Sequence, residues 1–270
     1  MSFVEKSGKK KRKTKPKIEL NFMTALEYKQ IRDNLMRQPT GTPIDDLIGG
    51  GIEQTEVVEF YGGYESGKTQ ICETLAVEVA NAEGDVVYVD TEDTFRPERI
   101  WEIAESRGYE AAKILKKIHL CQCLTTKELE AVFKKIPKKI DIKLLIIDSL
   151  TALYREEYVG RGMLSDRQGV LRQFVVALKK YVREKQCYCA CTNQVSDDPG
   201  AGPFMPLYIK QKGCGGNTLY HIINHRIFLR RGRGIQRIAR LVSSSLYPEG
   251  EVVFQIKKDG VSTVPEKIED

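Results

Sequence analysis

The sequence has no long apolar run and no internal repeat. No stretch reaches the roughly 18 apolar residues that a membrane-spanning helix requires. The first residues are polar and rich in lysine, so no secretory signal is visible. No Pro/Gly-rich linker interrupts residues 40–258. These absences exclude membrane-spanning and repeat architectures, and we expect the 270 residues to form one large intracellular domain with at most a small appendage.

The cysteines show no metal or disulfide pattern. Seven cysteines in such a chain favour reduced intracellular thiols over a disulfide framework. Cys187, Cys189 and Cys191 alternate along an expected strand, so their side chains lie on one side of it. A zinc site needs ligands that converge on a point, which one strand does not supply. We interpret these three cysteines as ordinary buried packing.

Positive charge is concentrated near the N-terminus. The net charge is +6, and residues 6–17 hold eight lysines and arginines and no acid. Subtracting these eight charges leaves a net charge of −2 for the rest of the chain. Residues 1–20 are therefore predicted to form a basic, disordered tail. Binding of nucleic-acid phosphates, a nuclear import signal at Lys9 to Lys13 and simple solubilisation all fit such a tail.

Residues 62–69 carry the motif that defines the ligand class. Their sequence fits G-x-x-x-x-G-K-[ST], the phosphate-binding P-loop, between a strand-like run at residues 57–61 and a helical pattern at residues 70–82. Backbone N–H groups would surround the phosphates of ATP, Lys68 would reach the β- and γ-phosphates, and the Thr69 hydroxyl would hold Mg²⁺. The expected cofactor-binding residues here are Gly62, Gly63, Tyr64, Glu65, Ser66, Gly67, Lys68, Thr69 and Gln70.

Strand and helix patterns alternate after the P-loop. Strands are predicted at residues 86–89, 118–122, 144–147, 187–192, 227–229, 238–242 and 252–256. Helices are predicted at residues 98–107, 127–135 and 165–184, the last with Ser165 as its N-cap. The alternation predicts an α/β fold with a mostly parallel twisted sheet, helices on both faces and antiparallel strands at the C-terminal edge.

Acidic residues follow two of the predicted strands. Asp148 ends the apolar strand at residues 144–147 and fits a Walker B aspartate that holds Mg²⁺; the alternative is a strand-capping role. Glu92 follows the strand at residues 86–89 and is our candidate for orienting and deprotonating the water that attacks ATP. Asp90 and Asp93 compete with it on spacing alone.

Several separate motifs resemble one family. They are Gly62 to Cys72, Tyr88 to Glu92, Thr94 to Arg99, Asp148-Ser149, Ala152 to Arg155, Thr192 to Val195, Gly215 to Asn217 and Pro248 to Glu251. In this order they resemble the RecA-type recombinases, specifically the archaeal and eukaryotic branch of RadA-like strand-exchange proteins. The resemblance covers about residues 20–260 and implies a RecA-like P-loop ATPase core over residues 41–270.

The resemblance assigns roles at the nucleotide site. Glu92 matches the catalytic glutamate of the family, acting with Lys68, and Gln194 matches the residue that senses the γ-phosphate and relays it to DNA-binding loops. Arg99 and Pro248 match positions that sandwich adenine, with the proline supplied by a neighbouring protomer.

Two segments match the DNA-binding loops of the family. The first is about residues 157–168, with Arg161 and Arg167 as its cations, and the second is about residues 195–216, with Phe204, Lys210 and Lys212. A 22-residue segment rich in Gly and Pro is too long for an ordinary connector. Cations combined with apolar side chains suit a single-strand binder, and a regulatory lid is the alternative.

Residues 21–40 are predicted to contain a polymerisation motif and a linker. Phe22-Met23-Thr24-Ala25 resembles the F-x-x-A motif of the family, in which Phe22 and Ala25 would enter pockets on the next protomer. The pocket is expected on the helix that carries Val132 and Ile136. Such a head-to-tail contact produces rings or helical filaments.

The sequence also departs from the family pattern. The small helical N-terminal domain usual in this branch is absent from these 270 residues. Asp93 replaces a glycine beside the catalytic glutamate, and Ser243-Ser244-Ser245 replaces an aspartate-led cap over the neighbour's ATP. These changes put the hydrolysis rate and the filament stability in question, not ATP binding.

Together with the P-loop, the resemblance implies a Mg²⁺- and DNA-dependent ATPase that forms filaments on single-stranded DNA and pairs it with homologous double-stranded DNA. It would act on intracellular DNA, in the nucleus of a eukaryote or the cytoplasm of an archaeon, with other recombination proteins as further partners. The main alternative is a paralogue that assists another recombinase as a mediator. A ring-forming helicase-like motor and a non-enzymatic DNA-coating protein are the remaining alternatives.

Overall fold

The computed structural model describes residues 22–198, 200, 202 and 204–265. The predicted basic tail of residues 1–20 lies outside the described residues. The chain divides into two compact units, Met1–Leu35 and Met36–Asp270. The division thus falls five residues before the start that we predicted for the core. Among the described residues, no helix is both long and apolar enough to span a bilayer.

The smaller unit contains one described helix, α1 (Ala25–Asp33). Thr24 and Glu27 form a capping box: Glu27 N–H donates to Thr24 Oγ1 at 3.2 Å, and Thr24 N–H donates to Glu27 Oε2 at 2.6 Å. No residue of α1 is buried, and the Phe22 side chain before it is 87% exposed. Phe22 and Ala25 are therefore accessible within this unit.

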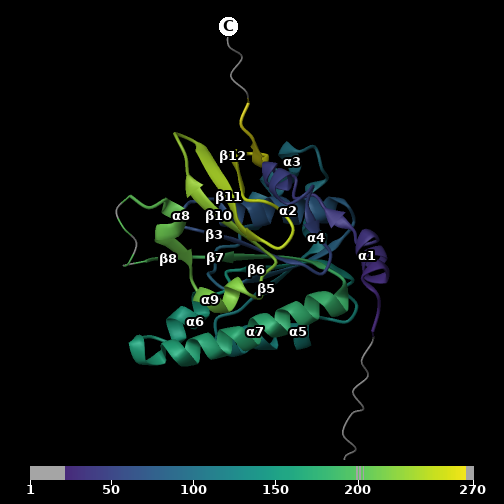
Figure 1. The fold of residues 1–270 in the computed structure, drawn as a ribbon. Coiled ribbons are helices and arrows are strands. Elements are labelled where there is room, and N and C mark those ends of the chain that lie inside the picture. The colour runs from purple at the N-terminus through teal and green to yellow at the C-terminus, as the bar shows by residue number, and fades with distance from the viewer. Residues whose placement is uncertain (1–21, 199, 201, 203, 266–270) are drawn as a thin grey trace, which may run out of the picture. The chain divides into compact units, whose positions relative to one another are not determined.

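Nine strands form the central sheet of the larger unit, in the order β13-β12-β11-β10-β3-β7-β6-β4-β5 (Figure 1). Their bounds are β3 Val57–Gly62, β4 Asp85–Asp90, β5 Ile118–Gln122, β6 Ile142–Asp148, β7 Tyr188–Asn193, β10 His225–Arg231, β11 Gln236–Ser244, β12 Gly250–Lys257 and β13 Gly260–Thr263. Strands from β10 to β5 pair in parallel, whereas β10 to β13 pair antiparallel. The predicted mostly parallel sheet with an antiparallel C-terminal edge is confirmed.

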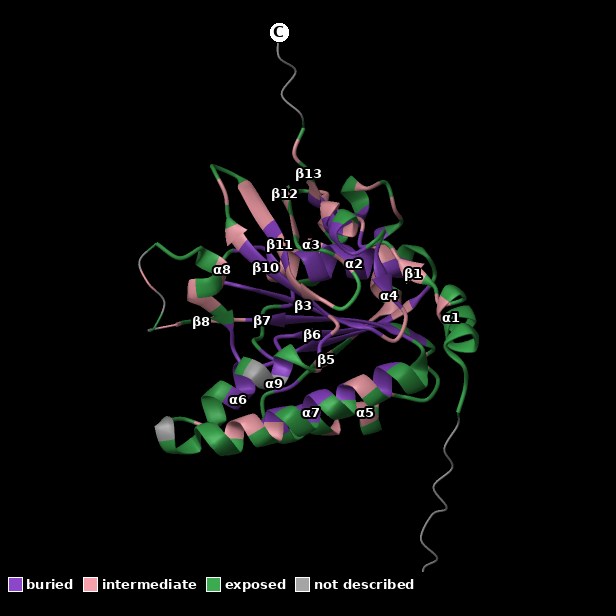
Figure 2. Ribbon diagram, in the orientation of Figure 1, coloured by how far each residue is buried: buried purple, intermediate pink, exposed green. Residues whose placement is uncertain are grey.

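Helices cover both faces of this sheet (Figures 1 and 2). One face carries α2 (Lys68–Asn81), α3 (Pro97–Ser106) and α4 (Ala111–Lys117). The other carries α5 (Thr126–Lys135), α6 (Ala152–Glu157), α7 (Leu164–Lys185) and α9 (Gly216–Tyr220). Along β4, Val86 and Tyr88 belong to one apolar core and Val87 and Val89 to the other, because successive side chains of a strand point to opposite faces.

Shorter elements complete the larger unit. They are β1 Arg37–Gln38 and β2 Ile52–Glu53, the 3₁₀ turns η1 Pro43–Leu47 and η2 Arg161–Met163, β8 Val195–Asp197, α8 Leu207–Lys210 and β9 Gln211–Gly213. The prediction that Ser165 caps the long helix is wrong. The η2 turn leads directly into α7, whose N-cap is Met163, so Ser165 already lies inside the helix. Helix α4 and strand β13 were not predicted.

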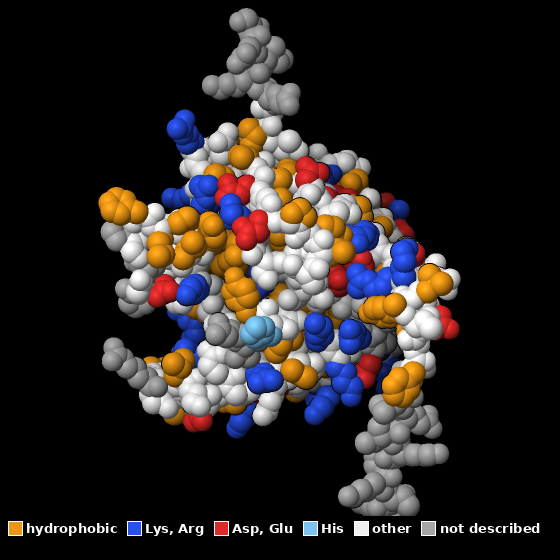
Figure 3. Space-filling model, in the orientation of Figure 1, with side chains coloured by type: hydrophobic (Ala, Val, Ile, Leu, Met, Phe, Trp, Pro, Cys, Tyr) orange, Lys and Arg blue, Asp and Glu red, His pale blue; other side chains and the backbone are white. Residues whose placement is uncertain are grey.

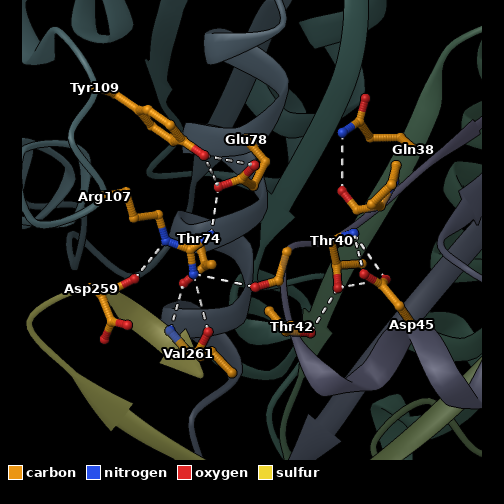
Figure 4. Close-up of polar contacts among 12 residues, drawn as sticks. Gln38, Thr40, Thr42, Asp45, Thr74, Glu78, Arg107, Tyr109, Asp259 and Val261 are labelled. Carbon is orange, nitrogen blue, oxygen red and sulfur yellow. Dashed lines mark hydrogen bonds and ion pairs between the residues drawn. The ribbon is translucent and has the colours of Figure 1, made fainter. Parts of the chain in front are cut away.

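Arg107, just after α3, fastens the β12–β13 turn to the helices (Figure 4). Its guanidinium donates to Asp259 O at 2.7 Å, to Val261 O at 3.1 Å and to Glu78 Oε1 at 2.5 Å. Val261 N–H donates to Thr74 Oγ1 at 3.1 Å on α2. The last two strands are thereby attached to the helix that begins at the P-loop.

Candidate functional site

The P-loop connects β3 to α2, as the sequence predicts. Gly67 is the N-cap of α2 and has φ +103°, a left-handed conformation that favours glycine. A Cβ at Gly67 would also lie 3.2 Å from Ile256 Cδ1 on β12. Since no side chain caps the helix, its first N–H groups remain available for an anion.

A cavity of about 590 Å³ lies at this loop. Its lining is Gly62, Gly63, Tyr64, Glu65, Ser66, Gly67, Lys68, Thr69, Gln70, Glu92, Thr94, Asp148, Gln194, Val195, Arg237 and Ile256. The structure therefore brings the whole predicted P-loop set together with three of the predicted functional side chains, Glu92, Asp148 and Gln194.

The residues around this cavity fit a polyphosphate. Ser66 Oγ is buried and has no hydrogen-bond partner among the described residues, so it is available to a ligand. Lys68 Nζ donates to Gly62 O at 3.0 Å and to Gly63 O at 2.8 Å. Burial lowers the pKa of Lys68, while the nearby carboxylates Asp148 and Glu92 raise it. Phosphate oxygens would be stronger partners for this ammonium than the two carbonyls.

Asp148 and Thr69 bring a carboxylate and a hydroxyl oxygen together at the end of the P-loop, and such oxygens are ligands that Mg²⁺ prefers. Asp148 Oδ2 accepts from Tyr88 Oη at 2.8 Å, and Oδ1 accepts from Thr192 Oγ1. Burial raises the pKa of Asp148, whereas hydrogen bonds from Thr192, Tyr88 and Thr69 lower it. The described residues contain no cluster of three or more His, Cys, Asp or Glu side chains that could hold a metal. A small set of protein oxygens suits Mg²⁺ bound together with phosphates.

Of the three acids at the end of β4, Asp90, Glu92 and Asp93, only Glu92 lines this cavity. Its Oε1 accepts from Ser149 Oγ, and Gln194 Nε2 lies 3.4 Å from both of its oxygens. Asp90, by contrast, is only 1% exposed and accepts from three backbone N–H groups, those of Glu92, Thr94 and Phe95. Asp90 therefore shapes the turn that presents Glu92, and only Glu92 lines the cavity.

Asp93 adopts a backbone conformation that glycine favours, which explains why the family pattern has a glycine at this position. Its φ is +55°, in the left-handed region that Asp tolerates better than most residues. Gln122 Nε2 at the end of β5 donates to Asp93 Oδ1 at 2.9 Å. Asp93 does not line the P-loop cavity, and its carboxylate is bonded to Gln122 instead.

Glu73 is a titratable group that the sequence did not single out. It lies on the buried side of α2, and Gln70 Nε2 donates to its Oε2 at 2.5 Å. Burial and the nearby Asp148 raise the pKa of Glu73 to about 8, against a lowering effect of Arg99. Glu73 lies three residues after Gln70, so the two side chains share one face of the helix. This spacing is the feature of the sequence that could have indicated their contact.

The two predicted adenine contacts do not line the cavity. Arg99 Nε donates to Gln70 Oε1 at 2.7 Å, and its terminal nitrogens donate to Lys257 O at 2.5 Å and Lys258 O at 3.2 Å. Pro248 is exposed in the turn between β11 and β12. Two cations missed by the sequence analysis hold the P-loop from β10 and β11: Arg231 pairs with Glu65, and Arg237 Nε donates to Glu65 O at 2.9 Å.

Gln194 and Glu92 line both the P-loop cavity and a second cavity. This second space, about 560 Å³, is lined by Glu92, Ala152, Arg155, Glu156, Tyr158, Val159, Gly160, Arg167 and Gln194. Arg155 donates to Gln194 Oε1 at 2.6 Å, while Gln194 Nε2 faces Glu92. Arg155, on α6 just before the first predicted loop, thus contacts a side chain of the P-loop cavity. Arg155 was not among the predicted site residues, and the Arg161 side chain lies outside the described residues.

The second predicted loop contains a β-hairpin. Strands β8 and β9 pair antiparallel, and Cys214 N–H donates to Gln194 O at 2.8 Å. Phe204 is 99% exposed beyond this pairing, and Lys212 pairs with Asp198 at 2.7 Å. Apolar side chains gather around α8 (Figure 3). Lys210 is the last residue of α8, so Phe204, Lys210 and Lys212 all lie within this one hairpin.

A buried polar network supports the base of this hairpin. Asn193 Nδ2 donates to Glu59 Oε1 at 2.6 Å and to Cys214 O at 2.7 Å. Arg226, only 2% exposed, pairs with Glu59, which is fully buried. The Arg226 guanidinium lies 4.4 Å from the centre of the Tyr220 ring. Charges buried this deeply need such partners.

The side chains predicted to form the pocket for a neighbour's phenylalanine belong to an apolar core. Val132 on α5 is buried in the core beneath α5 and α7, and Ile136 packs against it, partly buried. Cys121 of β5 packs on the same core, and β5 is an edge strand of the sheet. Whether Phe22 of another copy binds there remains a prediction.

Comparison with known proteins identifies the family. The family model described as Rad51 matches residues 31–264. The meiotic recombination protein DMC1 homolog of Lilium longiflorum is 36% identical over 255 residues, which cover 91% of this chain and 72% of that protein. The DMC1 homolog B of Oryza sativa subsp. japonica is 38% identical, covering 90% and 73%, and DMC1 of Saccharomyces cerevisiae is 35% identical, covering 91% and 76%. The chain therefore belongs to the Rad51 family, in the eukaryotic branch of the RecA-type recombinases.

Proposed function

We propose that this protein is an ATP-dependent DNA recombinase that forms filaments on single-stranded DNA and catalyses homologous pairing and strand exchange in recombinational repair. The observation that carries the proposal is the bridge at Gln194, which faces Glu92 of the nucleotide cavity and accepts from Arg155 of the second cavity. One side chain thus touches both the hydrolytic site and the predicted DNA-binding region. Meiotic recombination proteins among the relatives support the same function.

At the nucleotide site, the chain's own residues divide the work of ATP hydrolysis. Lys68, Ser66 and the N–H groups at the start of α2 would hold phosphate oxygens. Thr69 and Asp148 would hold Mg²⁺, which neutralises phosphate charge when bound. Glu92 would orient the attacking water and accept its proton, and its exposure and open position at the cavity support this role.

At the DNA side, the two loops would bind the strand. Arg161, Arg167, Lys210 and Lys212 would contact phosphates, and the exposed Phe204 would pack against bases. Because Gln194 joins β7 to the β8–β9 hairpin, a shift of its amide toward a phosphate would move the base of the second loop. Binding of ATP and binding of DNA would thereby favour the same state.

Self-assembly would complete the active form. The exposed Phe22 and Ala25 would enter the pocket at Val132 and Ile136 of the next copy, as an aromatic anchor of a head-to-tail interface. Arg99 in the same chain and Pro248 from the neighbour would enclose adenine. Filaments of this kind would act on intracellular DNA, and other recombination proteins would be its partners.

A mediator paralogue that binds ATP and DNA and assists another recombinase is the second candidate. Two departures of the sequence from the family pattern favour it: Asp93 replaces a glycine beside Glu92, and Ser243–Ser245 replaces an acidic cap. A joint-molecule assay separates the candidates, using ATP, Mg²⁺, single-stranded DNA and a homologous duplex.

The assay compares the wild type with Lys68→Ala and Phe22→Glu. A recombinase forms homologous joints alone, and both variants lose them, the first through phosphate binding and the second through self-assembly. Wild type that binds ATP and DNA but forms no joints by itself would identify the mediator instead.

A further inference from the structure

The turn between β11 and β12 is held at its start by one hydroxyl. Ser244 Oγ accepts from Leu246 N–H at 3.0 Å and from Tyr247 N–H at 2.9 Å. The same oxygen lies 3.0 Å from His225 Nδ1. Where the family has an acidic cap, this chain therefore uses a serine hydroxyl to fix the turn that carries Pro248.

His225 ties that hydroxyl to the core of the sheet. The His225 side chain is 2% exposed, and its Nε2 lies 2.7 Å from Oε2 of Glu56, which is also buried. The His225 ring also packs against the Tyr247 ring, with 5.5 Å between centroids. The backbone and the aromatic side chain of the turn are thus fixed to the same buried imidazole.

Arg37 also contacts Tyr247. One of its terminal nitrogens donates to Tyr247 Oη and, at 3.1 Å, to Ile48 O, while the other donates to Glu53 Oε2 at 2.5 Å. Gly49 has φ +65°, and a Cβ there would lie 2.5 Å from Tyr247 Oη. The Tyr247 ring therefore packs directly on the Gly49 backbone, and any side chain at position 49 would occupy the space of the ring.

The far end of the turn is fixed as well. Arg240 donates to Glu249 Oε2 at 2.7 Å and to Glu251 Oε1 at 3.2 Å. Pro248 lies between the two anchored residues, Tyr247 and Glu249, and is exposed. A rigid turn with an exposed proline at its crest is suited to contact another molecule with little loss of conformational entropy.

Arg37 comes four residues after the end of α1, in the segment that follows Phe22 and Ala25. We propose that Arg37 and Tyr247 are positioning residues that couple the docking of residues 22–33 on a neighbouring copy to the placement of Pro248 over a nucleotide at the filament interface. This inference rests on the proposed function. A shift of the linker at Arg37 would move Tyr247, and with it the adjoining Pro248.

The test is a double-mutant cycle with Tyr247→Phe and Arg37→Gln. Phenylalanine keeps the ring that packs on His225 and Gly49, and removes only the hydroxyl that Arg37 contacts. Tyr109→Phe is the matched control, because it also removes one tyrosine hydroxyl. That hydroxyl donates to Glu78 Oε1 at 3.2 Å and takes no part in the β11–β12 turn (Figure 4). The measured quantities are the ATP concentration for half-maximal filament assembly on single-stranded DNA, and KM and kcat of the DNA-dependent ATPase.

Each single variant is expected to raise KM and the half-maximal ATP concentration about tenfold, the effect of losing one charge-assisted hydrogen bond. The kcat at saturating ATP should stay unchanged, since neither residue touches the hydrolytic site. The double variant should be no worse than the more affected single variant, because both remove the same contact. Tyr109→Phe should match the wild type.

Two results overturn the inference: a wild-type KM in Tyr247→Phe, or effects of the two substitutions that multiply in the double variant. If Arg37→Gln fails to fold because Glu53 is left unpaired, Gly49→Ala replaces it and should raise KM by displacing the Tyr247 ring. If the wild type shows no ATP-dependent assembly, the proposed function is refuted. If the wild type assembles and Tyr247→Phe behaves in the same way, only the coupling is refuted.

Discussion

The buried Glu73 makes the stability of this protein depend on pH in a predictable direction. Its pKa is raised from 4.5 to about 8 in the folded state by burial and by Asp148. A raised pKa means that the folded state binds this proton more tightly than the unfolded chain does. The stability contributed by the protonated carboxyl is therefore fully present below the unfolded pKa and is lost as the pH rises through about 8.

The magnitude follows from the size of the shift. One pKa unit corresponds to about 1.4 kcal/mol, so the shift from 4.5 to about 8 corresponds to at most about 5 kcal/mol. Glu73→Gln keeps the shape and polarity of the protonated side chain without its ionisation. We expect the variant to match the wild type near pH 5 and to be more stable by several kcal/mol near pH 9.

Urea unfolding followed by circular dichroism between pH 5 and 9, without nucleotide, measures this difference. Glu105→Gln on the exposed side of α3 controls for the removal of one negative charge. If the stability difference between Glu73→Gln and the wild type is the same at pH 5 and pH 9, Glu73 ionises normally and the reasoning from its burial is wrong.

Three further outcomes test the site. Glu92→Gln should lower DNA-stimulated ATP hydrolysis by roughly 10²–10⁴-fold, measured as phosphate release, while fluorescent nucleotide still binds; an unchanged rate would transfer the role to another acid. Arg155→Gln should abolish most of the stimulation of the ATPase by DNA by breaking its 2.6 Å bond to Gln194, and full stimulation would contradict the bridge. Arg226→Met should reduce the free energy of unfolding by about 3–5 kcal/mol by leaving Glu59 without its buried counter-charge, and a double variant with Glu59→Gln should recover part of it in urea titrations.

The sequence predicts the sheet and the P-loop because their signals are local. A β-branched strand, a Gly-rich loop and a helical pattern lie next to one another in the chain, and Asp148 directly follows an apolar run. The segment at residues 195–216 gave no such signal. Strands β8 and β9 have three residues each and contain Asp, Lys and Gln, so their pairing depends on contacts with Gln194 and Asn193 instead of on a pattern.

The choice among Asp90, Glu92 and Asp93 likewise required the fold. All three lie within four residues, and only the direction of backbone N–H groups shows that Asp90 is fully engaged in the turn. The raised pKa of Glu73 depends on burial against residues far away in sequence, which composition does not encode. The same holds for Tyr247, whose partner Arg37 lies 210 positions earlier.

The attachment of the C-terminal strands to the P-loop helix has a consequence for synthesis of the protein. Gly67 packs against Phe254 and Ile256, and Thr74 is bonded to Val261. The phosphate-binding loop leaves the ribosome early, but its supporting surface is translated almost two hundred codons later, a delay of roughly 10–40 s at 5–20 residues per second. During that interval the P-loop of the nascent chain lacks the surface that packs against it in the folded protein.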